Sequence, residues 1–347
     1  MTALCLKAAR FHSPLDVRLE ELAEPEAGKG EVVIRVLASN MCGTDLKSFL
    51  RGHPLLRPPI TMGHEYCGVV VAAGEGAPFK EGERVVASNS APCMRCEMCS
   101  RGSYSICTSI KENMVGFSLP GSYAELMRIP AHIVSSNTYR FSGPSPEEIA
   151  CAEPLASVIH ALDRVSVEEG ETAAVVGAGA LGLMFLQLLK ARGAKVIVAN
   201  RSEARLEVAE RLGADVLLSV SDENLVSRLK DATDGVGADL VVEAVGRKET
   251  WEACFMAARD GGTVLQFGGC QGGTVVAFDA GKIHYGETTV VGSFHHEPSA
   301  FRRAVNAIEL GEVDVAPFLT HRVRLEDILE AFELMKTRQA MKVSVLP

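Results

Sequence analysis

Hydrophobic and polar positions follow two different patterns along this chain. Up to about residue 150, short β-branched runs are separated by Gly, Pro and Asn, as in a β-rich domain; the clearest are residues 32–37, 68–72 and 84–87. From residue 171 to about residue 293, apolar runs alternate with segments of helical period. This second pattern predicts strands at 173–176, 195–199, 214–218, 238–243 and 262–267, separated by helices at 183–191, 202–212, 223–233 and 248–259.

The alternation of strands and helices predicts a parallel, doubly wound α/β sheet in the second region. The tail that follows has two amphipathic helical segments, at 300–310 and 325–336, and a final strand at 342–346. Pro317 and the absence of another glycine motif indicate that this tail packs on the first region rather than extending the sheet. A chain of 347 residues is also long for one hydrophobic core, so we expect two domains.

Three glycines mark the first strand-to-helix turn of the second region. Gly177, Gly179 and Gly182 have the spacing G-x-G-x-x-G and follow the uncharged run 173–176. In such a turn the first glycine permits a tight bend, the second lets the backbone approach a pyrophosphate, and the third lets helix and strand pack closely. The helix N-terminus favours the same anion. The motif alone is weak in a chain with 32 glycines, but its position between a strand and a helix predicts a dinucleotide site.

Charge and hydropathy argue against several classes of partner. The net charge is −9 and no Lys/Arg block stands out, so we expect neither nucleic acid nor an anionic membrane as a partner. Residues 1–7 show no basic region followed by a long apolar stretch, and no apolar run of 18 residues occurs elsewhere, so we expect a cytoplasmic protein. The ten cysteines are therefore interpreted as thiols or metal ligands rather than as a disulfide framework.

Four of these cysteines lie close together in the sequence, at Cys93, Cys96, Cys99 and Cys107. Zinc bound by thiolates takes four ligands in a tetrahedron, and C-x-x-C spacing lets consecutive cysteines face one ion. A redox C-x-x-C pair and four incidental thiols are the alternatives. We predict a zinc site whose four positions are all filled by protein, and which is therefore structural.

Cys42, His64 and Glu153 are candidates for a second metal site, although each alone is more often a core residue than a ligand. Their contexts are Cys42-Gly-Thr-Asp, Gly-His64-Glu and Glu153-Pro, and they occur in this order with the cysteine cluster and the glycine turn. The combination closely resembles the zinc-containing medium-chain alcohol and polyol dehydrogenases, in particular sorbitol dehydrogenase-like and threonine dehydrogenase-like members, along the whole chain.

The resemblance implies a fold, a set of domains and an assembly. It implies a GroES-like, β-rich catalytic domain formed by residues 1–154 and 294–347, and a Rossmann dinucleotide-binding domain formed by residues 155–293. It also implies two zinc ions per chain, one catalytic and one structural. A homo-oligomer, either a tetramer or a dimer, is expected on the same ground, with a hydrophobic fraction of 47% as further support.

For the second metal site, the resemblance implies that Cys42, His64 and Glu153 hold the catalytic zinc and that Glu65 is a fourth, exchangeable ligand. Such a mixed S, N and O set suits a Lewis-acid zinc that binds the substrate oxygen while a nicotinamide takes the hydride. Cys151, two residues before Glu153, is the other candidate for the third ligand. The Glu-Pro context favours Glu153, and Cys151 is then a buried thiol.

The path of the substrate proton is less well defined. Thr44 resembles the hydroxyl that passes the alcohol's proton outward in this family, with an ordinary surface threonine as the alternative. Five residues after Cys42, where many members carry a relay histidine, this chain has Lys47. Either Lys47 itself takes part, or the proton leaves by another route such as solvent or the cofactor ribose.

Cofactor preference is predicted from the end of the second strand of the Rossmann domain, which carries Asn200 and Arg201. An acidic residue there accepts hydrogen bonds from the adenosine ribose in NAD-binding folds. Asn200 removes the charge that repels a 2′-phosphate, while Arg201 offers a fork of donors and Arg205 follows one turn later. We therefore predict NADP(H) over NAD(H), the alternative being a solvated Arg201 and an Asn200 that serves NAD. Further cofactor contacts are expected at Leu181, Val245 and Gly268.

The substrate is expected to be a small polar secondary alcohol or ketone, such as a polyol, a cyclitol or a sugar acid. The glutamate ligand favours this class, and an aromatic content of 5% gives no obvious aromatic-lined pocket. Simple alcohols and threonine-type amino alcohols are the alternative substrates. His295 and His296, at the last edge of the sheet, are candidates for contacts with substrate or cofactor, and surface histidines are the alternative.

Two other classes of protein share this fold. A zinc-free quinone reductase should lack Cys42, His64 and Glu153 together, and a non-catalytic member should have lost at least one of them. All three residues are present, so a zinc-dependent dehydrogenase is the favoured function.

Overall fold

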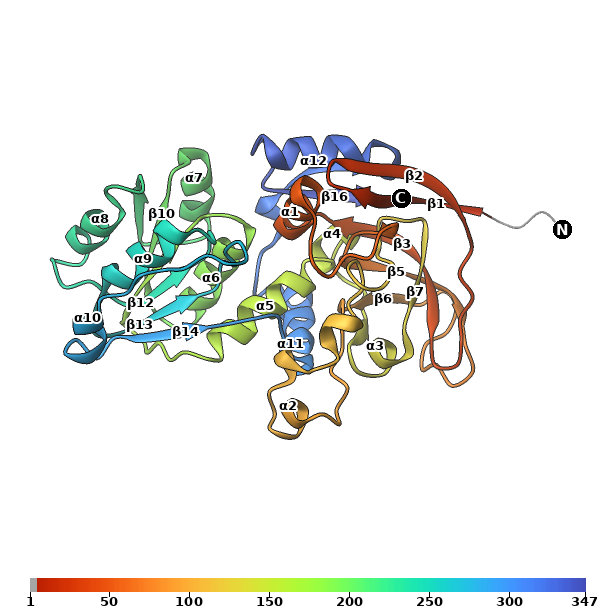
Figure 1. The fold of residues 1–347 in the computed structure, drawn as a ribbon, viewed down its shortest axis with the longest axis horizontal. Coiled ribbons are helices and arrows are strands. Elements are labelled where there is room, and N and C mark those ends of the chain that lie inside the picture. Colours follow the sequence, from red (N-terminus) through yellow and green to blue (C-terminus); the bar gives the residue numbers. More distant parts are fainter. Residues whose placement is uncertain (1–4) are drawn as a thin grey trace. The chain divides into compact units, whose positions relative to one another are not determined.

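The computed structural model describes residues 5–347, so the prediction made for residues 1–7 falls partly outside the described chain. Two compact units are present (Figure 1): residues up to Ser157 together with His296–Pro347 form the first, and Val158–His295 form the second. Helix α5 (Ala152–Leu162) contains the first point at which the chain passes from one unit to the other. None of the helices among residues 5–347 is long and apolar enough to cross a membrane.

The second unit is built on a six-stranded parallel sheet with the strand order β11-β10-β9-β12-β13-β14. Its strands are β9 (Thr172–Val176), β10 (Lys195–Asn200), β11 (Val216–Ser219), β12 (Ala238–Glu243), β13 (Ala258–Gln266) and β14 (Thr289–Gly292). Its helices are α6 (Ala180–Ala191), α7 (Glu203–Arg211), α8 (Leu225–Asp231), α9 (Lys248–Ala257) and α10 (Ala280–His284). The chain starts at the central strand, extends the sheet to β11 and then returns to the other side at β12, which confirms the predicted doubly wound α/β fold.

Strand β9 occupies the centre because its residues are small, apolar and uncharged. Val175 lies opposite Val198 of β10 on one side and Val242 of β12 on the other. Ala173, Ala174 and Val175 are fully buried. A strand covered on both faces tolerates no charged side chain, so this segment of the sequence specifies the middle of the sheet.

Several predicted boundaries in this unit are wrong by two to four residues; the largest difference is in β13, expected from residue 262 but beginning at Ala258. The strand expected at 214–218 begins at Val216. Gly213 adopts a positive φ of 89°, and the backbone N–H of Ala214 donates to the carbonyl of Ala209. The chain is still completing the end of α7 at this point, because a left-handed glycine after a helix turns the backbone back onto its last carbonyl groups.

The first unit contains a seven-stranded sheet, in the order β15-β16-β3-β5-β6-β8 with β7 paired to β3, and a three-stranded sheet in the order β2-β1-β4. Its strands are β1 (Cys5–Ser13), β2 (Asp16–Ala23), β3 (Val32–Asn40), β4 (Ile60–Thr61), β5 (Glu65–Ala73), β6 (Arg84–Ala87), β7 (Leu126–Ile129), β8 (Thr138–Arg140), β15 (Leu319–Arg324) and β16 (Lys342–Leu346). Its helices are α1 (Gly43–Arg51), α2 (Glu97–Ser100), α3 (Ala131–Ser136), α4 (Pro146–Ile149), α11 (Pro298–Glu309) and α12 (Ile328–Lys336), with short 3-10 turns at Tyr104–Ile106, Ile110–Glu112, Ala316–Phe318 and Leu325–Asp327.

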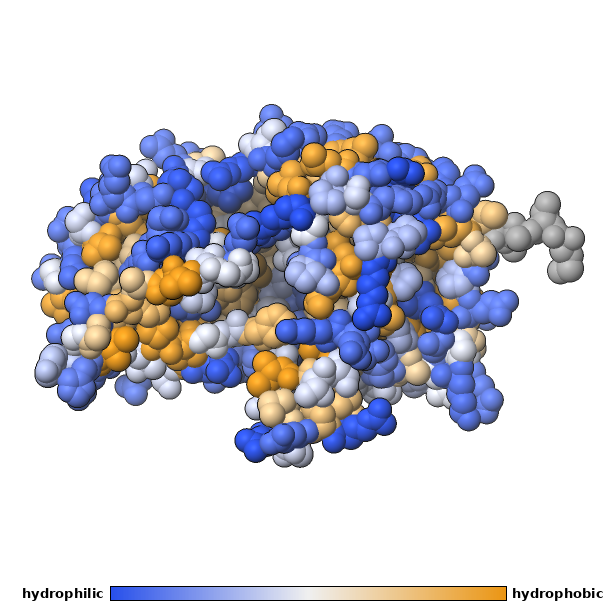
Figure 2. Space-filling view, in the orientation of Figure 1, coloured by the Kyte–Doolittle hydropathy of each residue, from blue (hydrophilic) through white to orange (hydrophobic). Residues whose placement is uncertain are grey.

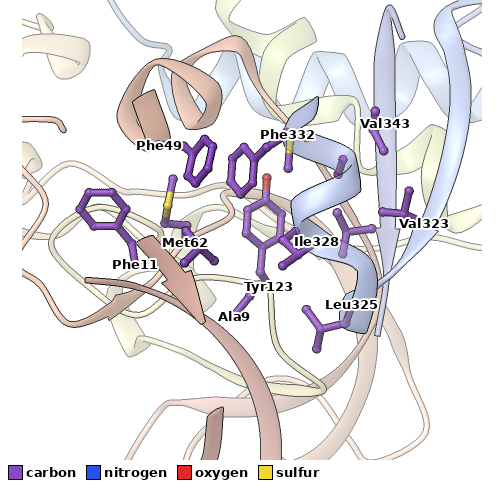
Figure 3. Close-up of a cluster of buried hydrophobic side chains, with 14 of the residues drawn as sticks. Ala9, Phe11, Phe49, Met62, Tyr123, Val323, Leu325, Ile328, Phe332 and Val343 are labelled. Carbon is purple, nitrogen blue, oxygen red and sulfur yellow. The ribbon is translucent and has the colours of Figure 1, made fainter. Parts of the chain in front are cut away.

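The tail returns to the first unit, as its sequence predicted. Strand β16 pairs antiparallel with β3, so that Ser344 lies opposite Asn40. Helix α12 covers the hydrophobic core beside it, and Phe332 of α12 stacks on Phe49 of α1 with ring centroids 4.3 Å apart. Figure 3 shows these two rings together with Met62, Tyr123 and Ile328, which come from distant parts of the chain. The last residues therefore complete the core that positions α1.

Candidate active site and cofactor site

Three candidate metal ligands meet where α1 and β5 begin. Cys42 Sγ, a ring nitrogen of His64 and a carboxylate oxygen of Glu65 all lie within 4.8 Å of one another. His64 and Glu65 are 4% and 0% exposed, and Glu65 Oε1 has no hydrogen-bond partner among the described residues. Sulfur, nitrogen and oxygen donors gathered around one point, with a carboxylate oxygen to spare, fit a zinc ion that keeps a fourth position for another ligand.

The backbone holds these ligands in fixed positions. Thr44 N lies 3.4 Å from Cys42 Sγ and donates to it, while Cys42 N donates to the Asp45 carboxylate at 2.9 Å. Gly63, just before His64, has a φ of 92°, and a Cβ there would lie 2.9 Å from Tyr123 N. The chain therefore makes a close turn beside another backbone segment before it presents His64, and this turn requires glycine.

Behind His64 lies a buried carboxylate and a tyrosine that the sequence did not single out. Asp45 Oδ1 is 3.3 Å from His64 Nδ1, and Asp45 Oδ2 accepts hydrogen bonds from Cys42 N and from Tyr123 Oη, each at 2.9 Å. Burial alone would raise the pKa of Asp45, but the nearby His64 and these hydrogen bonds lower it below its usual value. An ionised carboxylate at Nδ1 leaves Nε2 of His64 as the atom that faces a metal.

A buried ammonium group lies on the other side of the ligand group. Lys342 Nζ of β16 donates to Glu65 Oε2, across 277 positions of sequence, and Lys342 is 4% exposed. Burial would lower the pKa of Lys342, but Glu65, Cys151 and Cys42 raise it above its usual value. The lysine therefore stays charged and binds Oε2 of Glu65, while Oε1 has no hydrogen-bond partner among the described residues. Sequence reasoning missed it because Lys342 lies in an ordinary strand pattern with no motif.

Glu153 lies close to this group but outside it. It is not among the three residues whose ligand atoms lie within 4.8 Å, although its charge contributes to raising the pKa of Glu65. Glu153 Oε1 is 3.6 Å from His296 Nε2, which is also 3.1 Å from Ser88 Oγ. His296 is 2% exposed, so the surface interpretation of this histidine is wrong.

The neighbouring cysteine behaves as a core residue. Cys151 is fully buried, and its Sγ accepts a hydrogen bond from Asn40 Nδ2 at 3.3 Å and lies 3.6 Å from the carbonyl of Glu147. Burial raises the pKa of Cys151 to about 12. A thiol with this pKa stays protonated at neutral pH, as expected for the buried thiol predicted here.

The four clustered cysteines form a second group around α2. Their Sγ atoms all lie within 4.8 Å of one another, and that of Cys96 is 3.5 Å from Cys99 and 3.8 Å from Cys107. Backbone N–H groups of Cys99 and Thr108 lower the pKa of Cys96 to about 5. None of the ten cysteines, which all lie within residues 5–347, forms a disulfide. Four mutually close thiols, one of them already favoured as a thiolate, fit a tetrahedral zinc ion.

The two candidates for proton transfer, both in α1, differ in exposure. Thr44 is half-buried in its first turn, whereas Lys47 is exposed. In the loop after α1, His53 has its ring 5.2 Å from Phe117, and the same phenylalanine lies 5.0 Å from the ring of His64. The rings of Phe117 and His53 therefore lie beside the candidate ligand His64, although the low aromatic content did not predict aromatic side chains at this site. Neither His53 nor Phe117 is part of a motif, so the sequence did not point to them.

The glycine turn has the geometry that its spacing predicts. Gly177 has a φ of 107°, and a Cβ at Gly182 would lie 1.8 Å from the carbonyl oxygen of Gly177. Gly179 is the N-cap of α6 and provides no side-chain cap, while the nearest atom to a Cβ there would be Arg205 Nη1 at 3.9 Å. The first and third glycines are therefore required by the fold, and the second leaves the N-terminus of α6 accessible to an anion.

The remaining predicted cofactor contacts surround this turn. Leu181 is half-buried in the first turn of α6. Val245 packs over Gly177, whose Cβ would lie 2.8 Å from Val245 Cγ2. A Cβ at Gly268 would lie 2.5 Å from a carboxylate oxygen of Glu243.

Glu243, the last residue of β12, organises the loop that follows this strand, although it belongs to no sequence motif. It is fully buried, and its Oε1 accepts hydrogen bonds from Val245 N at 3.0 Å, Gly246 N at 2.9 Å and Thr250 Oγ1 at 2.6 Å. Burial raises the pKa of Glu243. The signal that was available is a carboxylate directly after the apolar run 240–242, where the strand meets the loop that follows.

The residues expected at the adenosine end are arranged around the end of β10. Asn200 Oδ1 accepts a hydrogen bond from Ala178 N at 3.3 Å, and its Nδ2 donates to the carbonyl of Ser202 at 3.2 Å. Arg201 is exposed, and its Nη1 lies 3.9 Å from Asp222. Asn200 therefore fixes the glycine turn, and the cationic groups beside it come from Arg201 and Arg205.

Comparison with known proteins agrees with both halves of this arrangement. The family described as alcohol dehydrogenase GroES-like domain matches residues 28–137, and the family described as zinc-binding dehydrogenase matches residues 180–309. The chain is 31% identical to a sorbitol dehydrogenase of Bombyx mori, with 97% of each chain covered. It is 32% identical to an L-threonine 3-dehydrogenase of Pyrococcus furiosus, with 94% of this chain and 93% of that protein covered.

A solved structure extends the match to the whole fold. It is a zinc-binding dehydrogenase of Sinorhizobium meliloti 1021 with NADP bound, and it superposes with a TM-score of 0.91 at 27% identity, covering 99% of this chain and 100% of that chain. Identity above 30% over nearly the full length, together with matches to both domain families, shows descent from the same group of enzymes. The chain belongs to the zinc-containing medium-chain alcohol and polyol dehydrogenases and is an NAD(P)-dependent enzyme that acts on CH–OH groups.

Proposed function

We propose that this dehydrogenase interconverts a small polar secondary alcohol, of polyol, cyclitol or sugar-acid type, and its ketone, with NADP as the hydride acceptor. The observation that carries the proposal is the buried group of Cys42, His64 and Glu65, because it offers a complete donor set beside ionised polar residues. Lys342 and Glu153 make the surroundings of this group charged rather than apolar. Such surroundings suit a substrate with several hydroxyl groups better than a long-chain alcohol.

We propose that each chain holds two zinc ions. Cys93, Cys96, Cys99 and Cys107 would hold the structural ion. Cys42, His64 and Glu153 would hold the catalytic ion, with Glu65 as the exchangeable fourth ligand. The two carboxylates are close enough for the charge of Glu153 to raise the pKa of Glu65, which supports an exchange between them as substrate or water enters.

When bound, the catalytic zinc would act as a Lewis acid toward the substrate hydroxyl, and the nicotinamide would accept the hydride. Asp45 and Tyr123 hold the imidazole of His64 in one orientation. Lys342 balances the charge of Glu65 and limits its movement. The Thr44 hydroxyl accepts the substrate proton and passes it outward, and the exposed Lys47 stands at the outer end of this path.

Replacing His64 by alanine tests the catalytic assignment. The variant should fold, bind one zinc ion instead of two and lose turnover, because a three-ligand site without its imidazole no longer fixes the metal. Turnover measured over polyols, sugar acids, cyclitols, simple alcohols and L-threonine identifies the substrate class. An active His64→Ala enzyme, or wild-type protein without zinc, would refute the site. A preference for L-threonine would favour the amino-alcohol alternative, which the relative from Pyrococcus furiosus supports.

The preference for NADP is proposed from Asn200, Arg201 and Arg205. Asn200 is neutral and its Oδ1 is already hydrogen bonded to Ala178 N, so no carboxylate at this position repels a 2′-phosphate. The ratio of kcat/KM for NADP and NAD should fall by about one to two orders of magnitude in Arg201→Ala, because a charge-assisted hydrogen bond contributes about 1.5–3 kcal/mol. A wild-type enzyme that prefers NAD, with a ratio that Arg201→Ala does not move, would overturn this preference.

We propose that the protein forms a homo-oligomer through the second unit. Strand β14 is at the end of the sheet order, and its free edge pairs with no strand among residues 5–347. Exposed apolar side chains occur on β14 and in the sequence before and after it, at Val275, Ile283, Tyr285, Val290 and Phe294. Figure 2 shows hydrophobic side chains gathered over the part of this unit that carries β13, β14 and α10. Light scattering over a wide concentration range tests the assembly, and a monomeric mass throughout would exclude it.

We also propose that the domains act as the sequence suggested, with residues 1–154 and 294–347 carrying the catalytic zinc and residues 155–293 binding the cofactor. A cytoplasmic location fits the free thiols that the four-cysteine site requires, since reducing compartments keep such thiols available for zinc.

A further inference from the structure

Three charged side chains meet at the carboxyl edge of the parallel sheet. Arg201 follows β10, Asp222 follows β11 and Arg247 follows β12. Arg247 donates two hydrogen bonds to Asp222, from Nη1 to Oδ2 at 2.9 Å and from Nη2 to Oδ1 at 2.5 Å. Arg201 Nη1 lies 3.9 Å from the same Oδ2. One carboxylate is therefore shared by two guanidinium groups.

These groups lie where the adenosine end of a dinucleotide binds in this fold. The end of the second strand, here β10, meets the adenosine ribose, and the glycine turn meets the pyrophosphate. The loop that carries Arg247 packs on the glycine turn, since a Cβ at Gly177 would lie 2.8 Å from Val245 Cγ2. Arg201 and Arg247 therefore follow the two strands, β10 and β12, that flank β9 and its glycine turn.

Arg247 also has a donor to spare. Its Nε is buried and has no hydrogen-bond partner among the described residues. A buried N–H without an acceptor is unfavourable, and a ligand that supplies an acceptor would relieve it. The carboxylate of Asp222 remains ionised at neutral pH, because hydrogen bonding from Arg247 lowers its pKa. The two guanidinium groups of Arg201 and Arg247 and the carboxylate of Asp222 together carry a single positive charge.

Building on the proposed preference for NADP, we propose that Asp222 determines how strongly the enzyme selects a 2′-phosphate. Its carboxylate occupies two donors of Arg247 and forms an ion pair with Arg201, groups that the phosphate would use, and it places a negative charge beside the phosphate. Binding of the phosphate is then an exchange of partners, in which the two arginines turn from the carboxylate to the ligand. Arg247 then donates to the 2′-phosphate, in addition to the residues Asn200, Arg201 and Arg205 from which the cofactor preference was predicted.

The exchange predicts opposite effects for two substitutions. Asp222→Asn keeps the size of the side chain and removes its charge, so 2′-AMP should bind about tenfold more tightly, because a unit charge a few Å from a dianion in watery surroundings has about that effect. Binding of 5′-AMP should change by less than about twofold. Arg247→Met should lower the affinity for 2′-AMP relative to 5′-AMP by about tenfold or more, since it removes a charge-assisted donor.

Titration calorimetry on the full-length protein measures both nucleotides directly, without turnover. Asp215→Asn is the matched control, because Asp215 has nearly the same exposure as Asp222, 34% against 36%, and is bound by Lys190 at 2.8 Å. It precedes β11 and therefore lies at the amino edge of the sheet. Its substitution should leave the ratio of the two affinities unchanged. Melting temperatures of all variants check that the unit remains folded.

The results separate this inference from the cofactor proposal on which it rests. A rise in the affinity ratio in Asp222→Asn, together with a fall in Arg247→Met, supports it. An unchanged or lower ratio in Asp222→Asn overturns it, and so does an equal change in Asp215→Asn. If Asp222→Asn does not fold, the test rests on Arg247→Met. An unchanged ratio of the affinities for 2′-AMP and 5′-AMP in Arg247→Met would then overturn the inference. A wild-type preference for NAD would contradict the cofactor proposal alone, because the charge of Asp222 would still weaken binding of 2′-AMP.

Discussion

Replacing Lys342 by methionine should destabilise the enzyme strongly when no metal is bound and much less when zinc is present. Lys342 and Glu65 are 4% and 0% exposed. Opposite unit charges in direct contact attract each other by several kcal/mol at an effective dielectric constant of about 20. Removing one partner of a buried pair costs about 3–5 kcal/mol, because the other charge stays buried without compensation. For a unit of about 200 residues this lowers the melting temperature by roughly 6–20 °C.

Zinc changes this expectation because, in the proposed site, the ion would be a second positive partner for Glu65. In the zinc-loaded protein the carboxylate left by Lys342→Met is still compensated, so the loss should be clearly smaller. Thermal unfolding is followed by differential scanning fluorimetry, once with added zinc and once after exhaustive chelation. The double variant Lys342→Met with Glu65→Gln removes both charges, and it should recover most of the stability of the metal-free protein.

A surface lysine provides the matched control. Lys336 pairs with Glu333 at 2.8 Å, and the two side chains are 47% and 56% exposed. An exposed pair contributes only about 0–1 kcal/mol, so Lys336→Met should leave the melting temperature nearly unchanged. If metal-free Lys342→Met melts within about 2 °C of the wild type, or if it loses as much stability with zinc as without it, the proposed partnership of Lys342 and Glu65 is wrong.

Three further changes follow from the structure. Tyr123→Phe removes the hydroxyl that donates to Asp45, so competition with a chelator should show zinc bound about tenfold more weakly while melting stays close to wild type. Cys96→Ser should lower the zinc content from two ions to one and reduce the melting temperature, with turnover per folded molecule largely kept; unchanged zinc content would argue against the four-cysteine site. Gly182→Ala places a Cβ 1.8 Å from the carbonyl oxygen of Gly177, so calorimetry should detect no binding of NADP. Normal affinity in that variant would mean that α6 can move away at little cost.

The sequence predicted the second unit well because its signals are local. An uncharged run such as 173–176 fits only a strand covered on both faces, and glycine at 177 and 182 is required by contacts within a few residues. In the first unit, β2 was missed because it is an edge strand with charged residues at half of its positions, and these hide the alternation of burial. Helix α1 was missed because nine residues give too short a period to recognise.

The residues of the candidate site also divide into those that a local sequence pattern predicts and those that only the fold brings together. The four clustered cysteines could be predicted from their spacing and residue type, whereas Cys42 and His64 were assigned through the family resemblance. Asp45 sits inside the motif Cys42-Gly-Thr-Asp, so its role was open to prediction once a buried partner for His64 was sought. Lys342 and Tyr123 were beyond sequence reasoning, because each meets the site through pairing of distant segments. The Lys342–Glu65 contact joins residues 277 positions apart, and no local pattern encodes such a meeting.

That long separation has a consequence for how the protein is made. Domains generally fold as units, in order from the N-terminus, while the ribosome is still adding residues. The second unit is continuous from Val158 to His295, so it can fold as soon as it has emerged. The first unit cannot, because β16 pairs with β3 and brings Lys342 to Glu65 only after nearly the whole chain has been synthesised. Until then β3 lacks its pairing with β16, and the carboxylate of Glu65 lacks Lys342. A zinc ion that arrives before this point would find the proposed site incomplete. We therefore expect that the proposed catalytic zinc would bind late, after the β9–β14 unit has folded.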